Sequence, residues 1–478
     1  MTTLQSIAAA AVILAVLIVV HEAGHFTMAK RLGVRVIRFS IGYPPKVWGV
    51  RRGETEYSIG LTPFGGYVRM LGEEVGEEPR SDELQNYVHE LALDVLEAAQ
   101  HHGWSTSSKD PDTDILVLAR RLTIDEGNPP VRAVAATSGA AALAIAPAVT
   151  YPRRQPVEVL GRDLSPAEAS VMSEISAKDS VADAQVRLGQ NPPMALLKSF
   201  EERSFPTQSL WKRFAIVLAG PASNLLFAPI LMTVVFLWGV PMLLPVVGQA
   251  KEGLPAHAAG LLTGDLIVSV DGKAVESWNE FSAAVKGGDG APIKLGIERG
   301  SGSSIIHRDL TITPKREDEA TVYGNKVPTW IIGVMPRGDE QTKRYGPIGA
   351  VEHGVTSTIE ITETLVIGIW QIVDGSTPVR QALGGPIMIA QMAGHEAHEG
   401  FAAVAMFTVM LSLQLGIINL LPVPLLDGGH LLFFACEGLR GKPLKLRHRE
   451  MALQVGLLLL VALMAFIIFN DISRIVQG

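Results

Sequence analysis

The stretch AVILAVLIVVHEAGH, residues 11–25, decides the fold of this chain of 478 residues. Its first ten residues are all apolar, and no Asp, Glu, Lys or Arg precedes Glu22. A bilayer core about 30 Å thick requires roughly 20 such residues in a helix. We therefore predict a membrane-spanning helix near residues 4–28, whose C-terminal part carries two histidines and a glutamate.

Three further stretches lack charged residues in the same way, at 214–250, 400–426 and 451–470. Each is mostly apolar and long enough to cross a bilayer as a helix. The predicted spans lie near 214–240, 402–421 and 451–470. The alternative is a set of buried helices in a large soluble core, which is disfavoured because four such runs occur in one chain.

Composition excludes several classes of protein. Charged residues make up 19% of the chain and apolar residues 47%, which excludes a disordered chain. The single cysteine, Cys436, excludes a disulfide framework and any cysteine-based zinc module. The net charge of −7 gives no reason to expect a nucleic acid partner.

A fifth uncharged run, residues 133–152, differs from the other four. It is dominated by Ala, Ser and Gly, and Pro147 interrupts it. Since alanine contributes little to membrane partitioning, we predict a soluble or surface-associated segment here.

The basic residues predict the orientation. Lys and Arg concentrate at 30–38, 212–213 and 440–449, and such residues favour the inner side of a membrane. The first segment lacks the basic start of a signal peptide, so we expect it to stay uncleaved. The predicted order is N-terminus outside, 30–213 inside, 241–400 outside, 436–450 inside and C-terminus outside.

The histidines of the first span form a candidate metal site. His21 and His25 are four residues apart, so they lie on one face of a helix and can both bind one zinc ion. Glu22 beside them can accept a proton from a zinc-bound water. The alternative is a chance motif on a solvated helix. Ionisable residues in a membrane helix cost about 2.5–3.5 kcal/mol each at its centre, which favours a metal site.

A third ligand is expected after the third span, in NLLPVPLLDGGH at 419–430. Asp427 is the first charged residue after the apolar run. Its alternative role is that of a solvated carboxylate at an ordinary helix end. His430 is a competing ligand, although we favour a supporting role for it. Pro422 and Pro424 predict that the helix breaks, and Gly428 and Gly429 predict a sharp turn.

HExxH in the first span and NxxPxPxLDGGH after the third together resemble the RseP branch of the site-2 proteases, which are intramembrane zinc metalloproteases. The similarity extends to GGYV at 65–68, GPASN at 220–224 and GGPI at 384–387. It covers most of the chain outside about 75–205. It implies Zn²⁺ as cofactor, single-span membrane proteins as substrates, such as anti-sigma factors or remnant signal peptides, and the lipid bilayer as surroundings.

The resemblance also assigns roles to individual residues. It implies His21, His25 and Asp427 as zinc ligands and Glu22 as the general base. It implies that Asn419 helps to hold substrate or an extended segment. The remaining residues with a predicted supporting role are Asn224, Pro422, Gly428 and Gly429.

Topology supplies an independent test of the four spans. With four spans, the first and third helices both run from outside to inside, so Asp427 can meet the histidines at a similar depth. If residues 133–152 also crossed the membrane, the third helix would reverse and the metal site could not close.

Two segments outside the spans predict β-structure. Residues 34–71 alternate apolar and polar residues between turn signals, which predicts short hairpin strands. An edge of this sheet could pair with an extended peptide; the alternative is a plain cap. The family commonly has Gly-Phe-Gly where this chain has Gly42-Tyr43-Pro44. Residues 245–316 resemble a PDZ domain, with a hairpin turn at Asp271-Gly272 and a capping box from Ser277 to Glu280; the alternative is an inert spacer.

Residues 347–373 predict an amphipathic helix on the outer membrane surface that gates the site. His395 and His398 have the wrong spacing for a second HExxH motif, so we expect them to be polar loop residues.

The predicted fold is a multi-pass α-helical membrane protein with four transmembrane helices, a membrane-associated β-hairpin sheet and an extracytoplasmic α+β PDZ domain. Two alternatives to a protease remain: a membrane PDZ adaptor with a structural zinc ion, and a zinc-dependent transporter. The insertion at 73–210 shows no chemistry-bearing motif. The predicted segments are 1–30 (first span), 31–72 (sheet), 73–210 (cytoplasmic insertion), 211–242 (second span), 243–318 (PDZ-like), 319–400 (linker and amphipathic helix), 401–430 (third span with Asp427), 431–450 (cytoplasmic loop) and 451–478 (fourth span and tail).

Overall fold

A computed structural model describes most of the chain. The described residues are 3–73, 81–104, 111–122, 164–178, 180–300, 305–320, 326–377 and 384–477. The alanine-rich run at 133–152 lies outside them. By internal contacts the chain divides into two compact units. One comprises Met1–Val20, Pro221–Gly428 and Ala452–Gly478, and the other comprises His21–Gly220 and Gly429–Met451.

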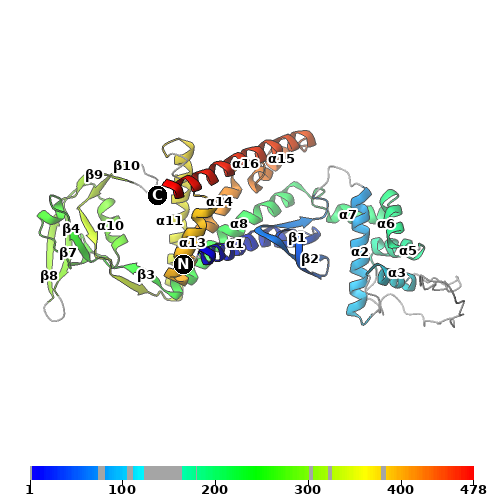
Figure 1. The fold of residues 1–478 in the computed structure, drawn as a ribbon, viewed down its shortest axis with the longest axis horizontal. Coiled ribbons are helices and arrows are strands. Elements are labelled where there is room, and N and C mark those ends of the chain that lie inside the picture. The colour runs from blue at the N-terminus through cyan, green and yellow to red at the C-terminus, as the bar shows by residue number, and fades with distance from the viewer. Residues whose placement is uncertain are drawn as a thin grey trace. The chain divides into compact units, whose positions relative to one another are not determined.

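Within the described residues, four helices are long and apolar enough to cross a membrane. They are α1 (Thr3–Arg31), α8 (Leu210–Trp238), α14 (Phe401–Leu420) and α16 (Leu446–Gln477), labelled in Figure 1. The four candidate membrane-spanning helices that the sequence predicts are therefore present, and their orientation in a membrane stays a prediction. α14 ends two residues before Pro422, because Pro422 and Pro424 lack the N–H groups that would continue the helix.

The segment after α1 forms two long strands, β1 (Val36–Arg52) and β2 (Thr55–Met70), where we expected several short ones. They are folded back on each other, so Phe39 has a partner on each side, Val68 and Tyr57. The bend lies at 42–45, where Gly42 has a φ of 87° and Pro44 and Pro45 offer no donors for a ladder.

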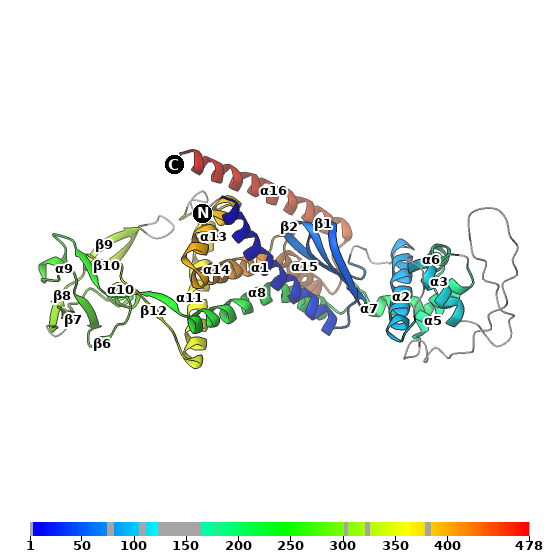
Figure 2. The same cartoon turned by 60° about the horizontal axis from the view of Figure 1, so that its bottom comes forward.

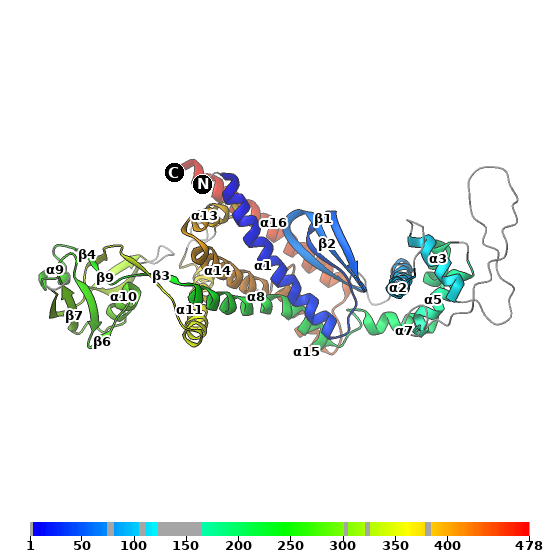
Figure 3. The same ribbon diagram turned by 90° about the horizontal axis from the view of Figure 1, so that it is seen from below.

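The insertion that follows the sheet is a helical bundle with its own apolar core. Its helices are α2 (Ser81–His101), α3 (Pro111–Leu122), α5 (Pro166–Ser176), α6 (Val181–Gln190) and α7 (Met194–Arg203). Figure 3 shows α2, α3 and α5 side by side. Fully buried residues of the core include Val88, Val95, Ile115, Met172 and Leu196. Such a core is typical of a folded module, although no motif in the sequence predicted it.

Residues 240–343 form an α+β domain. Its elements are β3 (Val240–Leu243), β4 (Val247–Ala250), α9 (Pro255–Ala258), β5 (Leu266–Val270), β6 (Lys273–Ala274), α10 (Trp278–Lys286), β7 (Ile293–Arg299), β8 (Ile306–Ile312), β9 (Lys315–Ala320), β10 (Lys326–Ile331), β11 (Val334–Pro336) and β12 (Glu340–Lys343). The largest sheet has the order β6-β5-β7-β8, and α10 contacts β5. Figure 2 shows α10 in this domain with β6, β7 and β8. Asp271 and Gly272 both have positive φ in the turn between β5 and β6, as a tight hairpin requires.

Among the described residues, three further helices are α11 (Pro347–Val373), α13 (Pro386–Glu399) and α15 (Asp427–Arg440). The loop predicted for His395 and His398 is wrong, since both lie in α13. The segment predicted as a cytoplasmic loop at 431–450 contains helix up to Arg440 and again from Leu446, and the side of the membrane on which it lies stays a prediction. Asp471 of α16 accepts hydrogen bonds from the N–H groups of Gly385 and Ile387, both at 3.1 Å, which satisfies the free donors that begin α13.

Candidate metal centre

The two histidines of α1 converge on one point. His21 and His25 are both 8% exposed, and their Nε2 atoms are 3.3 Å apart. Nδ1 of His25 lies 2.9 Å from the carbonyl oxygen of Ile216 on α8. Because a carbonyl can only accept, Nδ1 carries the proton and Nε2 keeps its lone pair. This is the tautomer that a metal ligand needs, held in place by a backbone acceptor.

α8 passes very close to these histidines because of Gly220. A Cβ added there would lie 2.2 Å from Nε2 of His25, a distance that real Cβ atoms do not adopt. One turn further along α8, the hydroxyl of Ser223 donates to the carbonyl of Val20 at 2.7 Å. Gly220 and Ser223 belong to the GPASN stretch, so the local role of that stretch is to let α8 lie against α1.

Asp427 completes the group. Ligand atoms of His21, His25 and Asp427 all lie within 4.8 Å of one another, and no other set of three such residues among those the structure describes is grouped this way. Asp427 is the first residue of α15, where the helix N-terminus favours a carboxylate.

The expected sharp turn at Gly428 and Gly429 is wrong, because both residues belong to the first turn of α15. Gly428 is needed for a different reason. A Cβ on it would lie 2.2 Å from the carbonyl oxygen of Leu421 and 2.4 Å from that of Leu420. The glycine therefore lets the start of α15 lie directly against the end of α14, and this contact fixes the position of Asp427.

Three other residues with a predicted supporting role lie on α8 or at the end of α14. Their roles toward a substrate stay predictions. Asn224 is fully buried, and its backbone oxygen accepts from the hydroxyl of Ser412 at 2.9 Å, which ties α8 to α14. Asn419 is half-buried in the last turn of α14, and Pro422 is exposed after it.

Ile216 contributes to this site although no feature of the sequence predicts it. It acts through its backbone oxygen, which any residue type provides, and it lies in an uninterrupted apolar run. Only the packing of α8 against α1 identifies it.

Two imidazole nitrogens and a carboxylate oxygen, with a glutamate adjacent in sequence, form a donor set suited to catalytic zinc. Its two histidines are buried on a helix that can span a membrane, and the half-buried Asp427 joins them from the start of α15. Together they define a class: the metal-dependent peptidases of membranes. The chain belongs to peptidase family M50, whose family model matches residues 9–463. It is a metalloendopeptidase of the site-2 type, as the sequence predicted.

Curated relatives match nearly the whole chain. The regulator of sigma-E protease RseP of Salmonella typhimurium is 33% identical over 99% of this chain and 100% of its own length. The zinc metalloprotease RasP of Geobacillus kaustophilus is 31% identical, with 99% of both chains covered. The regulator of sigma-W protease RasP of Bacillus subtilis is 27% identical, with 97% of both covered.

Proposed function

We propose that this protein is a zinc-dependent intramembrane peptidase that cleaves transmembrane segments of single-span membrane proteins. The observation that carries this proposal is the grouping of His21, His25 and Asp427 at the end of an apolar helix that can cross a bilayer. Both imidazoles are buried, and the proton on Nδ1 of His25 is placed so that Nε2 can bind a metal.

The residues present fit a zinc ion. His21 and His25 would supply nitrogen ligands and Asp427 an oxygen ligand, and the absent side chain of Gly220 leaves room beside Nε2 of His25. When bound, zinc supplies Lewis acidity that makes water a competent nucleophile near neutral pH and polarises a peptide carbonyl.

Glu22 is the proposed general base. It follows His21 directly on α1 and is half-buried. Its carboxylate accepts a proton from the attacking water and then donates it to the amine that leaves. A purely structural metal site has no use for such a residue, so Glu22 favours the peptidase over a metal-containing adaptor.

The surrounding elements suit an extended substrate in a membrane. No other described strand pairs with the sheet of β1 and β2, so its edges could pair with an unwound peptide. The α+β domain at 240–343 is proposed to be a PDZ domain that binds or excludes substrates outside the membrane. The proposed location is the inner (plasma) membrane, with both termini outside.

The names of the relatives support a proposal for the substrate class. Proteins named as regulators of sigma-E and sigma-W are similar over the whole chain. We propose anti-sigma factors or remnant signal peptides as the substrates of this protein too.

The test is cleavage of a tagged single-span substrate in cells that also produce this protein, either wild type or Glu22→Gln. We expect the shortened product only with the wild type, while both proteins accumulate in the membrane to the same level. Equal cleavage by both proteins, or none by either with zinc bound, would refute the proposal.

A further inference from the structure

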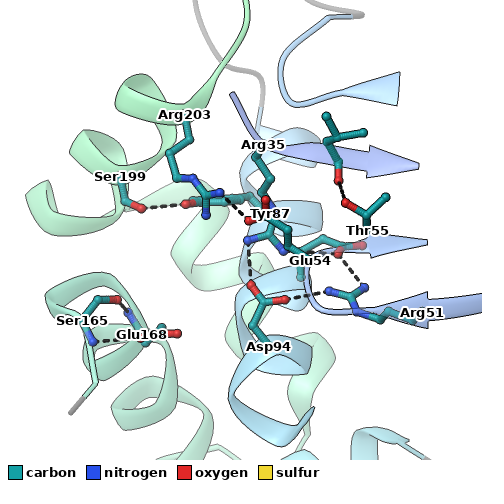
Figure 4. A network of polar contacts seen from close by, with 12 residues as sticks. Arg35, Arg51, Glu54, Thr55, Tyr87, Asp94, Ser165, Glu168, Ser199 and Arg203 are labelled. Atoms are coloured by element: carbon teal, nitrogen blue, oxygen red, sulfur yellow. Dashed lines mark hydrogen bonds and ion pairs between the residues drawn. The ribbon is translucent and has the colours of Figure 1, made fainter. Parts of the chain in front are cut away.

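Arg35 is a buried cation close to the catalytic helix. It lies four residues after the end of α1, and its side chain is 0% exposed. Its guanidinium pairs with Asp94 at 2.7 Å and with Glu90 at 3.5 Å, both on α2, and lies 5.6 Å from the ring centre of Tyr87. Figure 4 shows Arg35 facing α2 from the start of β1. The link from the sheet to the helical insertion therefore passes through the side chain of Arg35.

The backbone of Arg35 connects two more elements. Its N–H donates to the carbonyl of Arg203 at the end of α7 (3.0 Å), and its carbonyl accepts from the N–H of Leu71 after β2 (2.9 Å). One residue thus joins the start of β1 to α2, to α7 and to the end of β2.

Contacts continue from Arg35 to the histidines. The residues on either side of it, Val34 and Val36, are almost fully buried in one apolar cluster with Ile216. The carbonyl of Ile216 accepts the hydrogen bond that orients His25. A shift of the chain at Arg35 would therefore move packed side chains and disturb the orientation of His25.

Stability alone does not explain a cation here. Apolar side chains that replace both partners of a buried ion pair often cost no folding free energy, whereas removing one partner is costly when the other charge is left buried and unpaired. The two carboxylates would also keep a partner, because Arg51 pairs with Glu90 at 2.7 Å and with Asp94 at 2.9 Å. Replacement of Arg35 by methionine should therefore leave the chain folded and remove only the directional hold on α2.

We propose that Arg35 is a positioning residue of the peptidase, through which the helical insertion holds the end of α1 and the start of the sheet in their working arrangement. This inference rests on the proposed function, and it makes the insertion a support of the metal centre.

The test compares Arg35→Met and Asp94→Asn with a matched control, Arg187→Met. Arg187 is an exposed arginine of the same bundle that pairs with the half-buried Glu174. Hydrogen exchange of residues 26–36 is measured in the metal-free proteins. Zinc affinity is measured by competition with a chelator, and kcat and KM are measured per folded, zinc-loaded protein.

We expect Arg35→Met to lower kcat by about tenfold, as loss of an outer support of a metal ligand does. KM should not change, zinc affinity should fall, and exchange at 26–36 should accelerate. Asp94→Asn should shift the same quantities in the same direction, and Arg187→Met should shift none.

Arg35→Met with the kcat and exchange of the control would overturn the inference. A lower melting temperature with unchanged kcat per folded protein would overturn it too, since that result describes a merely structural residue. If the wild type shows no cleavage that depends on Glu22, the proposed function fails. The exchange and zinc measurements would still decide the role of Arg35.

Discussion

At the scale of single residues, the metal centre depends on residues that do not bind the metal themselves. The carbonyl of Ile216 selects the tautomer of His25, and the missing side chain of Gly220 makes room for its Nε2. Metal binding by the two histidines therefore depends on how closely α8 packs against α1.

Gly220→Ala tests this dependence. The added methyl group would lie 2.2 Å from Nε2 of His25, so the ring must move off the metal position. We expect zinc affinity to fall by about 10–100-fold, the range for disturbed support of a ligand. Titration with a competing chelator measures it.

Gly349→Ala on α11 is the matched control, because its nearest neighbour would be 3.7 Å from the new Cβ. It should bind zinc like the wild type. Equal zinc affinity of Gly220→Ala and Gly349→Ala would show that the close approach is not required.

How well single residues could be predicted depends on whether they act through side chains. His21, His25, Glu22 and Asp427 stood out because ionisable groups are costly next to lipid. The structure groups both histidines with Asp427. The predicted role of Gly428 in a sharp turn is wrong. Sequence alone does not distinguish a glycine in a turn from a glycine that lets two helices lie close together.

At the scale of elements, the helical insertion was the least predictable part. No feature of the sequence identified the residues that pair with the acidic face of α2. Glu90 and Asp94 are one turn apart and meet Arg35 and Arg51, which are distant in sequence. Spacing identifies the helix face, whereas only the fold supplies the opposite charges.

A second ion network joins the turn between β1 and β2 to α1 and α7. Glu54 pairs with Lys30 near the end of α1 and with Arg203 at the end of α7. Burial raises the pKa of Glu54, but Lys30 and Arg203 outweigh burial and hold that pKa below its ordinary value of 4.5.

This lowered pKa predicts a dependence of stability on pH. A carboxylate with a depressed pKa stabilises the fold fully above its ordinary value, and this contribution is lost as pH falls through the pKa of the folded state. The thermal midpoint of metal-free protein should therefore fall on acidification below about pH 4.5, and less steeply in Glu54→Gln. Parallel pH profiles for the two proteins would contradict this role of Glu54.

The sequence predicted β-structure after α1 but not the length or the register of the strands. Alternation identified strands within 34–71, yet the structure has two long strands, of which β1 bends at Gly42 and has partners on both sides at Phe39. Register between strands depends on partners elsewhere in the chain, which alternation within one strand does not specify.

At the scale of the whole molecule, four apolar helices and one ligand group constrain each other. The helices follow from the uncharged runs. For His21, His25 and Asp427 to meet at one depth, the first and third predicted spans must cross the membrane in the same direction. The basic residues then predict which side is inside.

Single cysteines test this orientation in a Cys436→Ser background. Asp289→Cys, after α10, and Lys442→Cys, after α15, both replace exposed residues. A maleimide that cannot cross membranes should label Asp289→Cys in intact cells stripped of their outer envelope. Lys442→Cys should react only after permeabilisation, and the reverse pattern would refute the proposed orientation.

The most direct test of the central claim is the initial rate at which purified, zinc-loaded protein cleaves a single-span substrate, wild type against Glu22→Gln in the same detergent. We predict equal zinc content and a loss of at least about a hundredfold in rate for Glu22→Gln, because general acid–base catalysis contributes about 10²–10⁴-fold. Equal rates at equal zinc content would contradict the account.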